Sequence, residues 1–115
     1  MPYLKLNTNI TINNSESSEL LSQLSQLIAK ETGKPELYVL VELNADKWML
    51  FAGSNAPLAY LECKSIGLSA PQAKSLSAAL SRLLERALAI PPDRIYIEFS
   101  PCPAEFWGWN GSTFG

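Results

Sequence analysis

The residue of this chain with the most distinctive chemistry is Pro2, because the sequence contains no histidine. Without imidazole there is no Ser-His-Asp or Cys-His nucleophile, no His-ligated zinc and no side chain that ordinarily titrates near neutral pH. Removal of Met1 would make Pro2 a terminal secondary amine, and the ordinary pKa of about 8 falls further in an apolar pocket or beside a cation. Such an amine could serve as general acid and base. Many chains begin Met-Pro without any such role, so residue types alone favour an ordinary chain start.

The two cysteines offer no obvious redox or metal site. Cys63 and Cys102 lie far apart in the sequence, in neither a C-x-x-C pair nor a cluster with metal-ligand spacing. A free cysteine behaves mostly as a small hydrophobic residue, which favours two buried structural thiols. With no histidine and no carboxylate cluster, the sequence predicts neither a metal nor another cofactor.

Length and composition predict one domain over residues 1–115. The 115 residues are 47% hydrophobic and 17% charged, which is enough to bury a core without metal or disulfide links. Nine Lys and Arg residues against eleven Asp and Glu give a net charge of −2 without a basic cluster, which argues against a nucleic-acid partner. Residues 1–5 lack a signal-peptide pattern, and no apolar run is long enough for a bilayer. We therefore expect a cytoplasmic protein with no membrane partner.

The first half of the chain predicts a strand, a helix and a second strand. Alternating residues in Pro2–Asn7 are typical of a strand that begins at the first residues of the chain. A helix is expected from a cap at Asn13 or Ser15 to a stop at Gly33. The β-branched and aromatic residues of Leu37–Leu43 predict the second strand. The apolar stripe of the helix consists of Leu20, Leu21, Leu24, Leu27 and Ile28.

The second half repeats this order. Leu58–Ile66 predicts a strand, and Ser69–Gln72 forms a capping box, with proline in the first turn of a helix whose apolar stripe runs to Leu88. Arg94–Phe99 predicts the next strand. Shorter extended segments are expected at Lys47–Phe51 and in a tight hairpin over Phe106–Phe114.

These elements predict an α/β (α+β) fold made of two similar β-α-β halves. Right-handed crossovers would give a four-stranded mixed sheet with both helices on one face and short strands at its edges. The second face of the sheet would then need a cover. The apolar run Val39–Leu43 favours burial of that face against other subunits.

Several short segments, in order along the whole chain, together resemble one known family. They are Pro2–Asn9, Thr32–Pro35, Met49 with Phe51, Gly53 and Ser54, Ser65–Gly67, Pro92–Ile97 and Gly108–Phe114. The set resembles the family of macrophage migration inhibitory factor and D-dopachrome tautomerase, within the tautomerase superfamily. The resemblance implies a homotrimer whose sheets line a central channel, with a catalytic amino-terminal proline in a pocket at each subunit interface.

The resemblance also implies roles for individual residues. Pro2 would move the proton between the enol and keto forms of an α-keto acid, and Lys34 would bind the substrate carboxylate and lower the pKa of the proline. The backbone N–H of Ile66 would contact substrate, and Tyr96 would supply a hydroxyl from a neighbouring subunit. Tyr38, Trp109 and Phe114 would form the aromatic pocket walls, and Trp107 falls at a wall position that is aliphatic in the animal cytokine. Each residue also has a plainer interpretation, because lysine can cap a helix end and aromatic residues can simply pack in cores or interfaces.

The sequence departs from the family pattern at two places that matter for chemistry. Glu98 stands where the family has asparagine, and alternation along the strand puts it on the same face as Tyr96, towards the pocket. A carboxylate there would repel an anionic substrate and raise the pKa of the proline, which predicts weak activity or a shifted substrate preference. Leu58–Leu61 replaces the C-x-x-C of the animal cytokine, so thiol-disulfide activity is not expected.

The resemblance therefore predicts an isomerase: a keto-enol tautomerase of small aromatic α-keto acids such as phenylpyruvate or hydroxyphenylpyruvate, extending to dopachrome-type compounds. Two alternatives stay open. The chain could be a non-catalytic, cytokine-like module that binds proteins and keeps a vestigial pocket, or a proline-dependent tautomerase or hydratase of another unsaturated acid, because one fold supports several chemistries. Release from the cell without a signal peptide also stays open.

Overall fold

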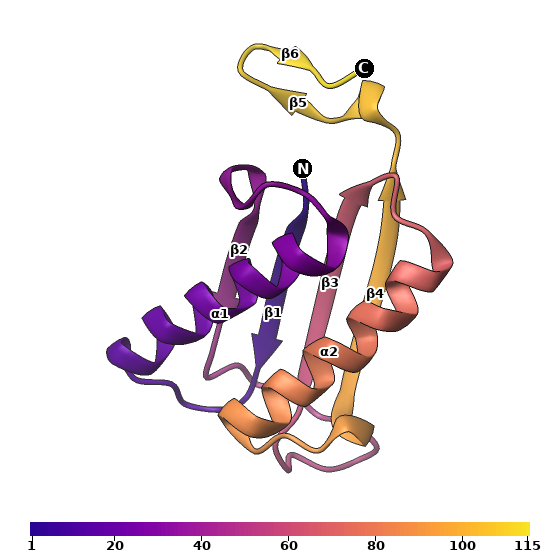
Figure 1. Ribbon diagram of the computed structural model, residues 1–115. Coiled ribbons are helices and arrows are strands. Elements are labelled where there is room, and N and C mark those ends of the chain that lie inside the picture. Colours follow the sequence, from indigo (N-terminus) through magenta and orange to yellow (C-terminus); the bar gives the residue numbers. More distant parts are fainter.

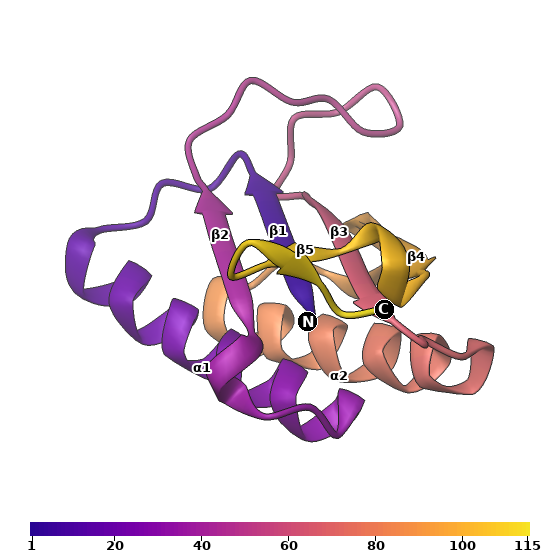
Figure 2. The ribbon, with the colours of Figure 1, turned by 90° about the horizontal axis from the view of Figure 1, so that it is seen from above.

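One mixed sheet with both helices on one face is the frame of the protein. The computed structural model describes residues 1–115. The sheet has the order β2-β1-β3-β4, with β1 parallel to β2, antiparallel to β3, and β3 parallel to β4. Figures 1 and 2 show both helices on the same face. The strands and helices are β1 Tyr3–Thr8, α1 Asn14–Thr32, β2 Leu40–Asn44, β3 Ala59–Ile66, α2 Ala70–Leu88 and β4 Ile95–Cys102.

The rest of the ordered backbone consists of short turns and one hairpin. Three single-turn 3-10 helices lie at Glu36–Tyr38, Pro92–Arg94 and Ala104–Phe106. The C-terminal hairpin pairs β5, Gly108–Trp109, with β6, Ser112–Thr113. It stands above the end of the sheet at which the chain begins (Figure 1). The predicted fold class and the predicted hairpin are thus confirmed.

The helix ends follow the local chemistry of the sequence. The Asn13 side chain accepts a hydrogen bond of 2.8 Å from the backbone N–H of Glu16, so Asn13 rather than Ser15 caps α1. Gly33, with φ of 70°, ends α1 in the left-handed region that glycine adopts without strain. Ser69 and Gln72 form the predicted capping box at the start of α2. Neither helix offers a stretch capable of crossing a bilayer.

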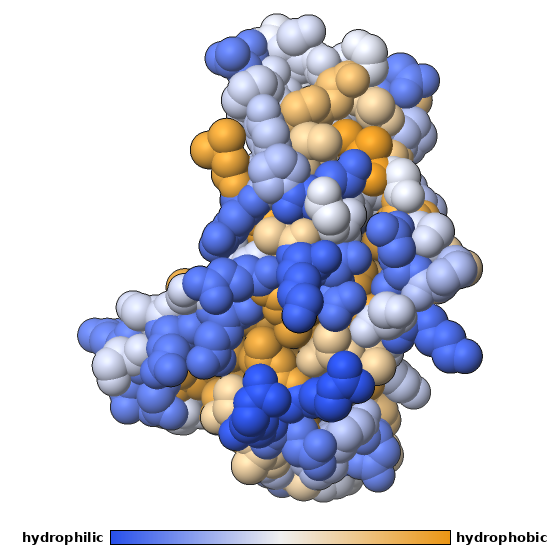
Figure 3. All heavy atoms as spheres, in the orientation of Figure 1, coloured by the Kyte–Doolittle hydropathy of each residue, from blue (hydrophilic) through white to orange (hydrophobic).

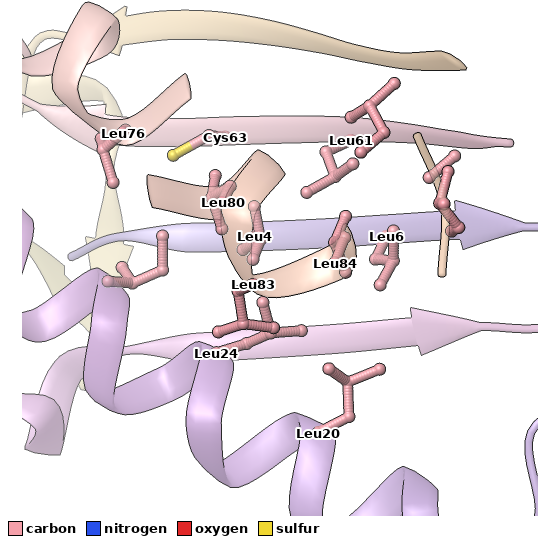
Figure 4. Close-up of a cluster of buried hydrophobic side chains, with 14 residues drawn as sticks. Leu4, Leu6, Leu20, Leu24, Leu61, Cys63, Leu76, Leu80, Leu83 and Leu84 are labelled. Atoms are coloured by element: carbon pink, nitrogen blue, oxygen red, sulfur yellow. The ribbon is translucent and has the colours of Figure 1, made fainter. Parts of the chain in front are cut away.

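The core lies between the helices and the face of the sheet that they cover. Leu4 and Leu6 of β1 project into it with Leu61 and Cys63 of β3 (Figure 4). Burial of one such leucine stabilises the fold by about 2 kcal/mol. Cys63 is buried as predicted, and burial raises the pKa of its thiol to about 11. The prediction of a second buried thiol is wrong, because Cys102 at the end of β4 is only half-buried. The helices contribute Leu20, Leu24, Ile28, Leu76, Leu80, Leu83 and Leu84.

The predicted strand over Leu37–Leu43 is wrong at its beginning. Pro35 starts a 3-10 turn, closed by hydrogen bonds from Tyr38 N–H to the Pro35 carbonyl and from Val39 N–H to the Glu36 carbonyl, each 3.0 Å long. The strand β2 begins only at Leu40. Here a proline-initiated turn outweighs the β propensity of the residues that follow it.

The predicted strand over Lys47–Phe51 does not form within the chain. Only an isolated bridge between Phe51 and Ser54 is present in this region. A strand needs a neighbour to pair with, and no strand of the same chain pairs with this segment. The loop between β2 and β3 instead extends away from the helices (Figure 2).

The face of the sheet opposite the helices is polar, not apolar. Val39, Val41 and Leu43 pack against the core on the helix side, so Leu40 is the one apolar residue of the run that lies exposed on the other face. Alternation along the strands places mostly polar and charged residues there. They are Tyr3, Lys5, Asn7, Glu42, Asn44, Tyr60, Glu62, Lys64, Tyr96 and Glu98.

Candidate active site

The beginning of β1 is enclosed by the parts of the chain that gather at that end of the sheet. Pro2 is fully buried, and its carbonyl accepts a hydrogen bond of 3.0 Å from Leu40 N–H, which joins it to the start of β2. Met1 precedes it at the mouth of a cavity of about 560 Å³. The cavity is lined by Met1, Pro2, Tyr3, Leu37, Tyr38, Val39, Leu40, Lys64, Cys102, Trp107, Gly108, Trp109 and Phe114.

Three aromatic rings form one compact wall of this cavity. The Tyr38 ring meets Trp109 edge-on, with centroids 5.4 Å apart, and meets Phe114 edge-on at 5.9 Å. Trp109 and Phe114 stack at 5.6 Å with an interplanar angle of 12°. Edge-on and offset contacts are the favoured geometries of aromatic pairs, so the three rings stabilise one another.

The C-terminal hairpin positions two of these rings and adds Trp107. Phe114 N–H donates a hydrogen bond of 3.1 Å to the Trp107 carbonyl. Asn110 and Gly111 have φ of 53° and 79°, the positive values that a tight two-residue hairpin turn requires. Figure 3 shows orange, hydrophobic residues between the hairpin at the top and the body of the molecule below it. The structure thus brings Tyr38, Trp107, Trp109 and Phe114 together around Pro2.

The terminal amine at this cavity is easier to deprotonate than an ordinary one. Burial, and then the positive charge of Lys34, lower the pKa of the Met1 amine. Lys34 follows the glycine that ends α1, and its backbone N–H donates to the Thr32 hydroxyl at 3.4 Å. Lys34 therefore acts electrostatically at the chain start, although its side chain does not line the cavity.

Ile66 lies near this end of the sheet but outside the cavity wall. It is the last residue of β3 and pairs with Cys102 of β4, which does line the cavity. Gly67, with φ of 72°, turns the chain directly after it.

Tyr96 and Glu98 do not belong to this cavity within one chain. Tyr96 is 65% exposed near the opposite end of the sheet, where its ring contacts Phe51 at 4.6 Å. Glu98 is exposed on the same open face, and the Tyr60 hydroxyl donates to its Oε1 at 3.5 Å. The two residues share a face of the sheet, as predicted. They could contact Pro2 only if Pro2 belonged to another copy of the chain.

Lys64, Leu37 and Cys102 also line the cavity, although the sequence did not indicate any of them as a residue of this site. Strand alternation could have put Lys64 on the polar face. It could not show that Lys64 pairs with Tyr3 beside the chain start, because that register depends on the antiparallel pairing of β1 and β3. No group of three or more carboxylate or thiol side chains gathers anywhere in the structure in an arrangement that would hold a metal ion.

Comparison with known proteins adds to this geometry. The sequence model of the macrophage migration inhibitory factor family matches residues 1–115. The chain belongs to this family. It is 44% identical to a macrophage migration inhibitory factor homolog of Brugia malayi, over the whole of both chains. It is 41% identical to macrophage migration inhibitory factor of Mus musculus, over 99% of each chain.

Solved structures of the macrophage migration inhibitory factor family have the same fold. The homologue from Prochlorococcus marinus superposes with a TM-score of 0.92 at 40% identity, covering 98% of this chain and 99% of the other. The protein from Trichinella spiralis gives a TM-score of 0.88 at 37% identity, covering 97% and 99%. The chain therefore has the tautomerase fold of this family.

Proposed function

We propose that the protein is a keto-enol tautomerase of small aromatic α-keto acids, and that Pro2 is its general base and acid. The observation that carries the proposal is the position of Pro2 in an aromatic-lined cavity at the chain start, where burial and then Lys34 lower the pKa of the Met1 amine. Membership of the macrophage migration inhibitory factor family and its tautomerase fold supports an isomerase. The proposal requires that Met1 is removed, because the nitrogen of Pro2 is otherwise an amide.

The reaction would proceed by two proton transfers through one group. The neutral amine of Pro2 takes a proton from one position of the substrate, and the protonated amine returns it at the other position. Lys34 and backbone N–H groups such as that of Ile66 would stabilise the carboxylate and the developing enolate oxygen. The aromatic wall of Tyr38, Trp109 and Phe114 would hold the substrate ring. This chemistry needs no metal or other cofactor.

We further propose that the active unit is a homotrimer. Trp48 is fully exposed in the isolated chain and Leu50 is 71% exposed, both on the loop that extends away from the helices. Apolar side chains in such positions are typical of interaction surfaces. A neighbouring copy could then supply Tyr96 and Glu98 to the cavity around Pro2, which the same chain cannot do.

A non-catalytic protein-binding module is the second candidate, and Glu98 is the observation that favours it. A carboxylate carried into the cavity by a neighbour would repel an anionic substrate. A third candidate is a proline-dependent tautomerase or hydratase of a different unsaturated acid, since the fold does not select one reaction.

The loss of phenylpyruvate enol absorbance, followed with wild type and Pro2→Gly, tests the proposal. The wild type should accelerate the decay, and Pro2→Gly should be slower by about 10²-fold, the usual contribution of a positioned general acid and base. Equal rates for the two proteins would remove the proline mechanism. A wild type without activity on phenylpyruvate, but active on another unsaturated acid, would favour the third candidate.

A further inference from the structure

The cavity around Pro2 has an unusual distribution of charge. Of its thirteen lining residues, Lys64 alone has a charged side chain, and no Asp or Glu is among them. The remaining wall is largely aromatic and aliphatic. Lys64 itself is exposed, so its ammonium is open to a ligand that enters the cavity.

The backbone fixes the place of Lys64 next to the chain start. Lys64 lies in β3 directly opposite Tyr3 of β1, the residue that follows Pro2. Its neighbours Cys63 and Ser65 are buried on the helix side, so the Lys64 side chain extends from the open face and reaches the cavity there.

The hydroxyl of Tyr3, which also belongs to the cavity lining, is already hydrogen-bonded. The Tyr3 hydroxyl donates a hydrogen bond of 2.7 Å to Glu42 Oε1, which raises the pKa of Tyr3 to about 12. Tyr3 therefore stays a neutral phenol directed to β2. Lys64 is left as the lining group best suited to an anionic ligand.

We propose that Lys64 is a second carboxylate-binding residue of the cavity, acting beside Lys34. The two lysines differ in position, because the Lys64 side chain lines the cavity and that of Lys34 does not. The ligand class is a small aromatic carboxylate, with its ring against the aromatic wall and its carboxylate at the Lys64 ammonium. This inference rests on the proposed function for the identity of the site, but binding can be measured without turnover.

Calorimetric titration of the Met1-free protein with 3-phenylpropionate tests the inference. This probe has a phenyl ring and a carboxylate but no keto group, and 3-phenylpropanamide is its neutral counterpart. Lys64→Gln should weaken binding of the carboxylate about tenfold, the value of one hydrogen bond to a charged group, and leave binding of the amide unchanged. Lys64→Arg should keep most of the affinity. Lys74→Gln removes the same charge at an exposed position of α2, and this variant should bind 3-phenylpropionate like wild type.

Three results would overturn the assignment. One is unchanged carboxylate affinity in Lys64→Gln, another is equal loss of carboxylate and amide binding, and the third is no binding of 3-phenylpropionate to wild type. A wild type that binds the carboxylate through Lys64 but does not tautomerise phenylpyruvate would contradict the proposed function alone. A wild type that is active while Lys64→Gln binds normally would contradict the Lys64 assignment alone.

Discussion

Tyr96 lies at the far end of the sheet from Pro2 of the same chain. Tyr96 pairs with Tyr60 on β3, and Tyr60 pairs with Asn7 on β1. At about 3.3 Å per residue, the distance along β1 from the level of Asn7 to Pro2 is about 16 Å, which a tyrosine side chain does not bridge. If Tyr96 serves the proline, it has to come from another subunit.

Mixed trimers test this sharing of residues between subunits. In the proposed homotrimer, Pro2→Gly and Tyr96→Phe would each damage every site. Unfolding and refolding the two variants together would give some sites with an intact Pro2 beside an intact neighbouring Tyr96. We expect the refolded mixture to exceed the mean activity of the two parents, measured with phenylpyruvate. A mixture that equals this mean would indicate that each site lies within one chain.

Removal of the Lys34 charge should change the pH dependence of the reaction. Lys34 lowers the pKa of the Met1 amine at this chain start. In the Met1-free protein we expect it to act on the Pro2 amine in the same way, so Lys34→Ala should raise the pKa of that amine and move the acid limb of kcat/KM to higher pH. Burial is the larger cause of the lowered pKa and stays in place. Lys34→Arg keeps the positive charge, so the acid limb of its kcat/KM profile should lie at the same pH as in wild type. Identical profiles for wild type and Lys34→Ala would show that the lysine does not act on the amine.

Replacement of Glu98 should increase activity. The Glu98 carboxylate would repel the substrate anion and raise the pKa of the proline of the neighbouring subunit. We expect Glu98→Asn to raise kcat/KM for phenylpyruvate about threefold to tenfold, equivalent to about 1 kcal/mol. Glu62→Gln is the matched control. Glu62 pairs with Glu98 on the same face, and this substitution removes the same negative charge. An unchanged or lower kcat/KM in Glu98→Asn would contradict the repulsion.

Arg94 should stabilise the loop that precedes β3. Its guanidinium donates hydrogen bonds to the carbonyls of Phe51, Ser54, Ala56 and Pro57, at 2.9 to 3.1 Å. Lysine cannot reproduce this fork, so Arg94→Lys should lower the free energy of unfolding by about 2 kcal/mol, measured by urea denaturation. Arg86→Lys, at an exposed position of α2, should be neutral. Equal stability of the two variants would mean that the loop does not depend on Arg94.

Local sequence signals were sufficient for the parts of the fold that depend on local chemistry. The helices could be predicted because their signals lie within a few residues, as in the capping box of Ser69 and Gln72 and the stop at Gly33. The order of the elements then limits the sheet to few arrangements. The segment Lys47–Phe51 shows where this fails, because a strand depends on a partner that the sequence does not reveal.

The candidate site could be predicted only in part for a similar reason. Pro2 and the aromatic residues stand out by type and by family resemblance, and the fold brings them together. Lys64 has no distinguishing signal in its own segment. Its place in the cavity comes from the register between β1 and β3, which joins residues far apart in the chain.

The amine of Pro2 is proposed to move the proton, and it exists only when the peptide bond between Met1 and Pro2 has been cut. Two preparations of the same chain, with and without Met1 and checked by intact mass, differ in whether the Pro2 nitrogen is an amide or an amine. Their kcat/KM values for phenylpyruvate should differ by at least about 10²-fold, with activity only in the Met1-free form. Equal values for the two preparations would contradict the role of Pro2.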